Sequence, residues 1–544
     1  MRTVMDLLDQ HDPRRGLFLY SSLIESPEFL SYRDLRARAC VAVASYRAQG
    51  LAPGDRVIFP FHTSLDAIAS FLAIVSIGAL PFSVKTALKP GAGVDLAFLE
   101  VIARRYRATY AAGLGADDAR ALALRLLVSG GAVDGAVDRA PGLRPGNESD
   151  LLFVQFSSGS TSFPKGVPVT HGGLMQQLAI LTTVDDRREG DVYASWLPLY
   201  HDMGLIAGML TSLYAGNDLH LMPPLEFVRD PMAWLGLLSR VEATHTITPY
   251  FGINHCTKQL VLDDAPEIQK WDFRKLRSWF VGSDPTDYDV MMAFQKLLEP
   301  RGLRAETLLP CYGMAEAVLM VSGIDRAERP KVHVREDGRK FVSVGRLVPG
   351  FEARITREDG TICKDGELGE IELRGATMVG RYFEDSTVDF FNEGGYFQTG
   401  DIGYLISGEI YIAGRIGDRI KVNGQTLVSN EFELAVEALA FVRAGKSVVF
   451  QIEDRIMLLV EVPPEEAKAG RRRELIEAIV AQLGVKLRLA DVLFIRSGQL
   501  KKTSSGKLRR RVIAEAYLRN EIRFIETSDF EPKRTDHRKE GANV

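Results

Sequence analysis

Apolar runs of strand length alternate with amphipathic segments of helix length from near residue 30 to about residue 310. Helical patterns cover 32–46 and 65–77, and glycine-containing breaks follow both of them. The strand candidates fall near 56–61, 80–84, 151–156, 192–197, 218–222, 244–248, 276–281 and 306–309. This alternation is typical of parallel βαβ units, so we expect an α/β fold with doubly wound sheets in a large N-terminal domain.

The pattern changes twice further along the chain. From about 340 to 413, short strand candidates and glycine-rich turns predict a small antiparallel sheet or barrel-like subdomain. After Arg415 a helix near 429–440, strands near 446–461 and a helix near 472–483 predict a separate α+β unit. The predicted organisation is a large domain, a small C-terminal domain and a polar tail that we expect to be disordered, with the bounds 1–415, 416–524 and 525–544.

Composition excludes several classes of protein. The 544 residues include 67 Lys and Arg against 71 Asp and Glu, a net charge of -4 that is too balanced for a chain whose main partner is nucleic acid. The four cysteines are far apart and form no CxxC pair, so neither a zinc site nor a disulfide framework is indicated. We find no charge-free apolar run of about 18 residues and no signal-peptide pattern, so we expect a cytoplasmic protein without a membrane span.

The segment Phe156–Gly166, FSSGSTSFPKG, directly follows a strand candidate. Its small residues let several backbone N–H groups and hydroxyls approach a polyphosphate, and Lys165 adds a positive charge. A Walker loop would need Gly before the lysine and Ser or Thr after it, whereas Pro164 and Gly166 stand there. The segment therefore predicts a nucleotide site of another kind than the P-loop.

This loop and further motifs resemble, in order along the chain, those of the adenylate-forming superfamily of acyl-CoA synthetases, nonribosomal adenylation domains and luciferases. The motif at 197–205, LPLYHDMGL, looks like the form found in fatty acyl-AMP ligases. The other matching segments are Val281–Pro285, Cys311–Ala317, Gln398–Asp401, Gly414–Arg415 and Thr503–Lys507. The resemblance implies that the chain uses ATP and Mg²⁺ to convert a carboxylic acid into an acyl-AMP.

The resemblance also implies roles for individual residues. Lys507 matches the lysine that bridges the carboxylate and the α-phosphate, and Glu316 matches the residue that helps to hold Mg²⁺. Tyr312 is expected to stack on adenine, Asp401 to accept from the ribose hydroxyls, and Arg415 to contact ribose or phosphate. The full set of implied nucleotide-binding residues is Ser157, Ser158, Gly159, Ser160, Thr161, Lys165, Gly282, Ser283, Asp284, Tyr312, Gly313, Met314, Asp401, Arg415 and Lys507.

The candidate catalytic residues are Lys507, Thr161 and His201. We expect His201 to lie at the mouth of the acyl pocket as a gate or positioner, because the nucleophile is already an anion. Tyr250, Phe251 and Gly252 are the candidate lining of that pocket. No Asp stands in 250–256 to hold an α-amine, which favours a fatty or aryl acid over an amino acid.

The resemblance further implies that the small domain rotates between adenylation and thiol transfer. The hinge position falls on Gly417, where family members usually carry Asp or Lys. Glycine permits the backbone change but supplies no side chain to hold either state.

Two acceptors remain open, an acyl carrier protein acting in trans and free CoA. The residues of the 197–205 motif favour the carrier protein. By contrast, the segment 380–399 has the short length found in CoA ligases and lacks the usual fatty acyl-AMP ligase insertion. Basic residues of the small domain suit either acceptor: Arg471, Arg472, Arg473, Lys486, Arg488 and the run 501–511. A binding protein without turnover is a third alternative, but it would need neither Lys507 nor Glu316.

Overall fold

The computed structural model describes residues 4–527 except for 10–11, 13, 21–25, 87–93, 130–146, 157–164, 263–265, 337, 385–389, 423–424, 444, 469 and 503–507. The chain folds into two compact units. The large unit contains most of the chain up to Thr399, together with Gly403–Ile412. The small unit contains Gly400–Ile402 and the chain from Ala413 onward. Our sequence-based boundary lies at 415.

A six-stranded sheet carries the first βαβ units of the large unit, in the order β6-β5-β3-β4-β7-β8. Its neighbours are parallel except for β7 and β8, which pair antiparallel as a hairpin. The strands are β3 Arg56–Pro60, β4 Leu80–Val84, β5 Tyr110–Ala112, β6 Arg125–Leu127, β7 Leu151–Phe156 and β8 Gly166–Thr170. The β7–β8 hairpin matters for function because the glycine- and serine-rich segment connects these two strands.

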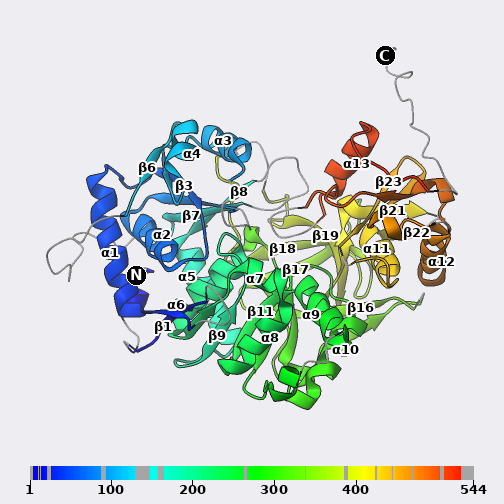
Figure 1. Cartoon of the computed structure of the whole chain (residues 1–544), viewed down its shortest axis with the longest axis horizontal. Coiled ribbons are helices and arrows are strands. Elements are labelled where there is room, and N and C mark those ends of the chain that lie inside the picture. The colour runs from blue at the N-terminus through cyan, green and yellow to red at the C-terminus, as the bar shows by residue number, and fades with distance from the viewer. Residues whose placement is uncertain are drawn as a thin grey trace, which may run out of the picture. The chain divides into compact units, whose positions relative to one another are not determined.

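The second sheet has 14 strands and begins with a parallel part, in the order β13-β12-β11-β9-β10-β1. Strand β1 is added beside β10, and β2 closes that edge antiparallel to β1. The strands are β1 Gly16–Leu19, β2 Glu28–Ser31, β9 Val192–Ser195, β10 Asp218–Leu221, β11 His245–Pro249, β12 Ser278–Gly282 and β13 Leu308–Gly313. The predicted parallel α/β architecture is thus confirmed (Figure 1).

Antiparallel pairing, which the glycine-rich texture predicts, joins β14 to β13 and β16, β16 to β15 and β20, and β17 to β18. The strands from β14 to β20 continue the same 14-stranded sheet. They are β14 Met320–Gly323, β15 Val332–Val334, β16 Lys340–Leu347, β17 Phe351–Thr356, β18 Gly369–Gly375, β19 Phe397–Ile406 and β20 Glu409–Arg415. The β-rich segment is therefore an extension of the large sheet.

Local sequence signals explain where the helices begin and end. Ser31 caps α1 by accepting from the Asp34 N–H at 3.1 Å, and Ser64 caps α2 by accepting from Ala67 at 3.1 Å. Gly78 ends α2 with a φ of 86°, which a residue with a side chain adopts only with strain. The helices of the large unit are α1 Tyr32–Ala48, α2 Leu65–Ile77, α3 Leu96–Arg105, α4 Ala116–Ala121, α5 His171–Val184, α6 Thr211–Ala215, α7 Pro224–Arg229, α8 Pro231–Arg240, α9 Tyr250–Leu262 and α10 Tyr288–Leu298.

A buried charge cluster joins the amino ends of β9, β11 and β12. His245 is fully buried; its Nδ1 lies 3.0 Å from Oδ1 of Asp185, and its Nε2 lies 3.0 Å from Oδ2 of Asp191. Burial lowers the pKa of His245, but the Asp185 charge and the hydrogen bonds to both aspartates outweigh it and raise the pKa overall. The cluster lies at the ends of the strands opposite to those where open α/β sheets bind ligands, so we interpret it as structural.

The small unit packs helices on both faces of a three-stranded sheet, ordered β23-β24-β25. Alternate residues of β23 face opposite cores: Val449 joins the cluster with α11 and α12, whereas Val448 and Phe450 join the cluster with Ile513 of α13. The elements are β21 Arg419–Val422, β22 Gln425–Val428, α11 Ser429–Glu437, β23 Ser447–Ile452, β24 Arg455–Glu461, α12 Arg471–Leu483, β25 Val492–Ile495 and α13 Arg510–Leu518. Ile525, where we place the start of the tail, still donates to the Phe494 carbonyl at 2.9 Å.

Among the described residues, no helix combines the length and the apolar character needed to cross a membrane.

Candidate active site

The ends of the glycine- and serine-rich segment are fixed by the β7–β8 hairpin. Phe156 and Gly166 are register partners, and the Gly166 carbonyl accepts from the Phe383 N–H at 2.8 Å. A Cβ at position 166 would lie 3.1 Å from Cγ1 of Val154, so the glycine allows close packing there. The predicted residues Ser157, Ser158, Gly159, Ser160 and Thr161 of the loop, and Lys507 of the small unit, lie outside the described residues.

Lys165 and Glu316 are brought to the same tyrosine side chain. Nζ of Lys165 lies 4.4 Å from the centroid of the Tyr382 ring, and the Tyr382 hydroxyl donates to Oε1 of Glu316 at 3.0 Å. Glu316 is half-buried in a short 3₁₀ turn, Ala315–Ala317. The sequence suggested both charged residues but gave no sign of Tyr382, which belongs to none of the matched motifs.

This array fits the hard cation that the resemblance implies. Mg²⁺ is commonly held by one or two carboxylates together with substrate phosphates and water. Glu316 supplies one carboxylate, and no cluster of three His, Cys, Asp or Glu side chains among the described residues could hold a metal ion without a substrate. The donor set therefore suits a metal that arrives with a polyphosphate.

The segment that follows β12 is held close to β13. A Cβ at Gly282 would lie 3.1 Å from Sγ of Cys311, and Ser283 has a φ of 75°, an uncommon value for a residue with a side chain. Strained backbone of this kind persists where the surrounding structure fixes it, often at ligand sites. Gly282, Ser283 and Asp284 thus lie at the carboxyl end of a parallel strand, where open α/β sheets bind their ligands.

Tyr312 and Gly313 end β13, and Met314 follows them. The Met314 N–H donates to the Leu319 carbonyl at 2.8 Å, and a Cβ at Gly313 would lie 2.0 Å from that same oxygen. Packing alone therefore requires the glycine of this motif. Tyr312 is partly buried against the core of the large unit, and the stacking of its ring on adenine stays a prediction.

His201 is paired with its neighbour in sequence. Its Nδ1 lies 2.6 Å from Oδ1 of Asp202, which also accepts from the Met203 N–H at 2.8 Å. Met203–Leu210 forms a π-helix, and every residue of it is buried. Because π-helical turns are rare and occur frequently at functional sites, this segment supports the assignment of the 197–205 motif to the site. The resemblance alone did not identify Asp202 as the partner of His201.

The candidate acyl-pocket residues begin α9, directly after the carboxyl end of β11. Tyr250 is buried, whereas Phe251 is 38% exposed. A Cβ at Gly252 would lie 2.4 Å from Oγ1 of Thr248 and 3.2 Å from Cζ2 of Trp196. Trp196 in turn stacks on the Phe227 ring, with the centroids 3.8 Å apart. These contacts form an aromatic wall beside the predicted pocket.

In the small unit, Asp401 and Arg415 form an ion pair. Nε of Arg415 donates to Oδ1 of Asp401 at 2.8 Å, and the carboxylate is almost fully buried. Gly417 lies in the 3₁₀ turn Ile416–Asp418, and no atom lies within 4 Å of the position that a Cβ would take there. The turn therefore accepts a small side chain, and glycine is not required by packing.

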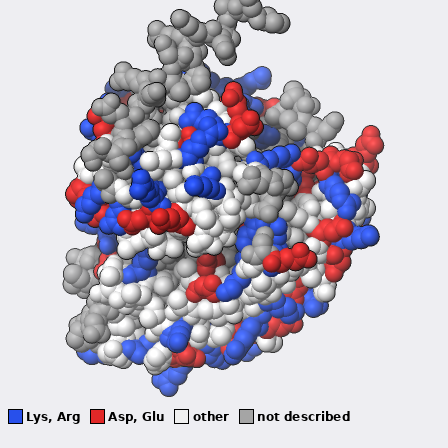
Figure 2. Space-filling view, turned by 90° about the vertical axis from the view of Figure 1, so that its right-hand side faces the viewer, with Lys and Arg blue, Asp and Glu red and all other residues white. Residues whose placement is uncertain are grey.

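The predicted basic surface of the small unit is smaller than the sequence suggested. Arg472 is 1% exposed and lies over the Phe494 ring, and Arg510 is paired with Glu433 and Asp418. Neither side chain is available to a partner. The face drawn in Figure 2 shows basic and acidic groups interspersed, without one extended basic surface.

The comparisons with known proteins show the class of acyl-adenylate-forming ligases, and the fold agrees with it. Residues 12–383 match the model of the AMP-binding enzyme family, and residues 417–527 match the AMP domain of the Disco-interacting protein 2-like family. The chain therefore belongs to the AMP-binding enzyme family.

Two curated relatives are similar over different parts of the chain. A candidate acyl-CoA synthetase of Caulobacter vibrioides is 31% identical over 541 residues, which cover 92% of this chain and 93% of the relative. The medium-chain-fatty-acid acyl-carrier-protein ligase TtuA of Teredinibacter turnerae is 30% identical over 414 residues, which cover 69% of this chain and 64% of the relative.

Solved structures agree with the fold. A structure from a study of fatty acyl-adenylate ligases from E. coli and L. pneumophila superposes with a TM-score of 0.84 at 25% identity, covering 96% of this chain and 98% of the other. ATP-bound MatB from Rhodopseudomonas palustris superposes with a TM-score of 0.76 at 22% identity, covering 94% and 98%, and supports the fold alone.

Proposed function

We propose that the chain activates an apolar carboxylic acid with ATP and Mg²⁺ and then transfers the acyl group to the phosphopantetheine thiol of an acyl carrier protein acting in trans. The observation that carries the first half is the array of Lys165, Tyr382 and Glu316 beside the glycine- and serine-rich segment. The acceptor is supported by the relative TtuA, which is named as an acyl-carrier-protein ligase.

In the first step a carboxylate oxygen attacks the α-phosphorus of ATP. A C–O–P anhydride forms, the bond between the α- and β-phosphates breaks, and pyrophosphate leaves. Lys165 offsets phosphate charge, and we propose the same for Lys507 at the reacting carboxylate and α-phosphate. When bound, Mg²⁺ would neutralise further phosphate charge beside Glu316.

In the second step the thiol sulfur attacks the carbonyl carbon of the acyl-AMP. A thioester forms, AMP leaves and the thiol proton is released. His201, held through Nδ1 by Asp202, would act as a gate or positioner for the acyl group at the mouth of the pocket. Asp401 would bind ribose hydroxyls, and Arg415, which donates to that carboxylate, would contact ribose or phosphate.

Free CoA is the second candidate acceptor. The short spacing of 380–399 favours it, because the insertion usual in fatty acyl-AMP ligases is absent. The Caulobacter relative, whose alignment covers most of this chain, is also named as a candidate acyl-CoA synthetase.

Pyrophosphate exchange over a panel of fatty and aryl acids tests the first step. Product mass with CoA and with a holo-acyl carrier protein then tests the second. Exchange that depends on an apolar acid, followed by thioester on the carrier protein, is the expected result. Absence of acid-dependent exchange would contradict the adenylation step. Thioester formation with CoA alone would identify CoA as the acceptor.

A further inference from the structure

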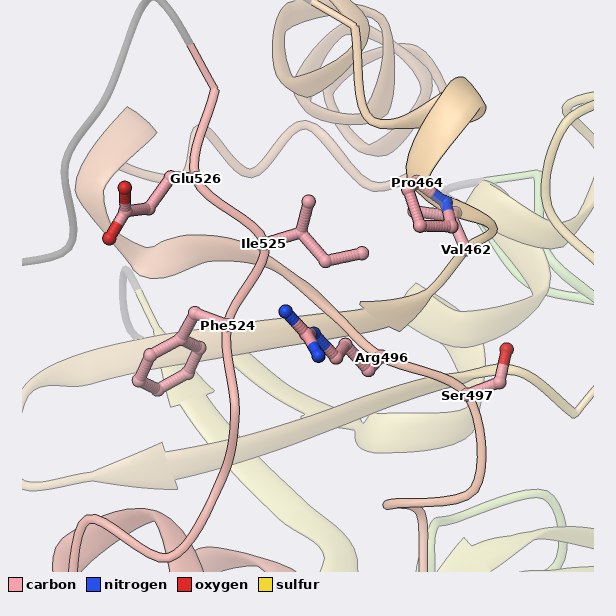
Figure 3. A pocket seen from close by; sticks show the side chains of 7 residues that line it. All are labelled: Val462, Pro464, Arg496, Ser497, Phe524, Ile525 and Glu526. Atoms are coloured by element: carbon pink, nitrogen blue, oxygen red, sulfur yellow. The ribbon is translucent and has the colours of Figure 1, made fainter.

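A pocket of about 520 Å³ lies on the small unit, between the end of β25, the loop after β24 and the residues that follow α13. Apolar side chains form most of its lining, and the polar members are Arg496, Ser497 and Glu526. Figure 3 shows the guanidinium of Arg496 beside Phe524 and Ile525, with the carboxylate of Glu526 directed away from it. The pocket thus combines an aliphatic and aromatic wall with one cationic group.

A second arginine lies directly opposite Arg496. Ile495 and Phe524 are antiparallel bridge partners, and the Arg496 N–H donates to the Arg523 carbonyl at 3.3 Å. Opposite residues of an antiparallel pair place their Cβ atoms on the same face. Arg496 and Arg523 are therefore two like charges held side by side.

The side chain of Gln499 fixes this arrangement. Its Nε2 donates to the carbonyl of Arg496 at 3.2 Å and to that of Arg523 at 2.7 Å, while its Oε1 accepts from the Arg523 N–H at 2.5 Å. The Gln499 amide therefore links the two backbone segments through its own hydrogen bonds. Both arginine backbones are held rigidly, although their side chains are exposed.

Neither guanidinium forms an ion pair or a side-chain hydrogen bond with any residue that the structure describes. Like charges directly opposite each other destabilise a strand pair, and nothing among the described side chains offsets that repulsion here. Other arginines of the same unit do have carboxylate partners, among them Arg455 with Asp491 and Arg519 with Glu521. What distinguishes Arg496 and Arg523 from other exposed cations of the unit is that they lie opposite each other beside an apolar pocket, and this combination indicates a site for an external anionic group.

We propose that this arginine pair and the adjoining pocket dock the acidic, amphipathic helix surface of the acyl carrier protein. The inference rests on the proposed carrier-protein acceptor. Carboxylates of the partner would pair with Arg496 and Arg523, and an apolar side chain between them would enter the pocket against Val462, Pro464 and Ile525. An acidic helix supplies both kinds of group at one surface, which matches the mixed character of the site.

The test is the double variant Arg496→Glu/Arg523→Glu, assayed with purified holo-acyl carrier protein of the type II fatty-acid-synthase kind. The KM for that protein should rise about tenfold or more, because two attractive pairs become repulsive. Pyrophosphate exchange should stay within about twofold of the parent, since the substitutions do not touch the proposed adenylation residues. The neutral variant Arg496→Gln/Arg523→Gln should show a smaller rise in KM.

The matched control is Arg473→Glu/Lys486→Glu, which changes the same charge on two other exposed cations of the small unit for which no ion pair is found among the described residues. This control should leave the KM for the carrier protein nearly unchanged. An equal rise in the KM for the carrier protein in both double variants would mean that the net charge of the small unit, and not this pair of arginines, determines binding. That result would overturn the docking site.

The remaining outcomes separate this inference from the proposed function. An unchanged KM in the Arg496/Arg523 variant overturns the docking site and leaves the function intact. A raised KM for CoA without a change for the carrier protein would reassign the arginines to a nucleotide phosphate. A parent enzyme that forms acyl-AMP but never loads the carrier protein overturns the acceptor and the docking site together, whereas failure to form acyl-AMP overturns the proposed function itself.

Discussion

The guanidinium of Arg510 donates to Oδ2 of Asp418 at 2.8 Å, across 92 residues of sequence. Arg510 also pairs with Glu433, a buried carboxylate of α11. Asp418 directly follows Gly417, so this ion cluster fastens the C-terminal side of the predicted hinge to α11 and α13. We therefore expect backbone rotation at the predicted hinge to be confined to the residues before Asp418.

The first prediction concerns Gly417→Pro. Proline fixes φ near -65° and disfavours the helical region for Ile416, which lies in the same 3₁₀ turn. We expect thioester formation from preformed acyl-AMP to fall about tenfold, a difference of about 1.4 kcal/mol in barrier height. Pyrophosphate exchange should fall less. Gly417→Ala is the control, because its Cβ meets no atom within 4 Å. Equal losses of rate in both half-reactions for the proline variant would contradict the assignment of Gly417 as the hinge.

Lys507→Ala tests the predicted catalytic lysine. Loss of one preorganised charged donor should slow adenylation by roughly 10²-fold or more. ATP binding, measured by calorimetry, should persist because the other predicted nucleotide residues remain. Lys501→Ala, at an exposed position of the same basic run, is the control and should adenylate at the parental rate. Equal rates in the Lys507 variant and the parent would show that another residue has this role.

Glu316→Gln tests the metal role while keeping an acceptor for the Tyr382 hydroxyl. We expect the Mg²⁺ concentration for half-maximal exchange to rise about tenfold, the scale on which metal-site substitutions act. Tyr382→Phe, which keeps the ring beneath Lys165, should change the Mg²⁺ requirement less. Exchange that survives complete chelation of divalent cations would contradict a metal at this position.

Gly252→Ala tests the acyl pocket. The added Cβ would lie 2.4 Å from Oγ1 of Thr248, so α9 or the Trp196 wall must shift. We expect kcat/KM in the exchange assay to fall by about tenfold for long acids and less for short ones, since lost pocket space costs about 1–3 kcal/mol. Gly236→Ala in α8 meets Trp271 at an ordinary 3.5 Å and serves as the control. A uniform loss over all chain lengths would place the acyl tail elsewhere.

The charge cluster at His245 predicts a pH-dependent contribution to stability. Because the folded-state pKa of His245 is raised above its unfolded value, its stabilisation is complete below about pH 6.5 and is lost as the pH rises through the folded pKa. In urea titrations, the free-energy difference between the parent and His245→Gln should be about 3–5 kcal/mol at pH 6 and smaller at pH 9.

His220→Gln is the matched control for this titration. Burial, together with the Arg240 charge, lowers the pKa of His220 to about 4, so the imidazole stays neutral from pH 6 to pH 9. The cost of its replacement should therefore not change over that range. A constant difference for His245→Gln as well would show that His245 is neutral in the folded protein.

Local patterns predicted the elements well because strands and helices depend on residues close together in the chain. The apolar runs at 80–84 and 151–156 coincide with β4 and β7, and the helical pattern at 65–77 coincides with α2. The family could be predicted from the order of the motifs for the same reason, because each motif is a short continuous segment.

The missed features depend on contacts between distant segments. Tyr382 reaches Glu316 across 66 residues, and Arg510 reaches Glu433 across 77. No periodicity marks such partners, and Arg472 sits in a visibly basic run although its guanidinium is buried over Phe494. A charge count therefore overestimated the cations that are available to a partner.

Strand β1 lies between β2 and β10, with Leu17 opposite Leu219. During synthesis at about 5–20 residues per second, the first strand must wait roughly 10–40 s before β10 has been made. The loop that this pairing closes spans about 200 residues, and its closure entropy is offset only when the neighbouring strands are also in place. The large unit thus cannot complete its sheet in the order in which it leaves the ribosome. The edge formed by β1 is exposed to chaperones, or to mispairing with another chain, until β10 has been translated.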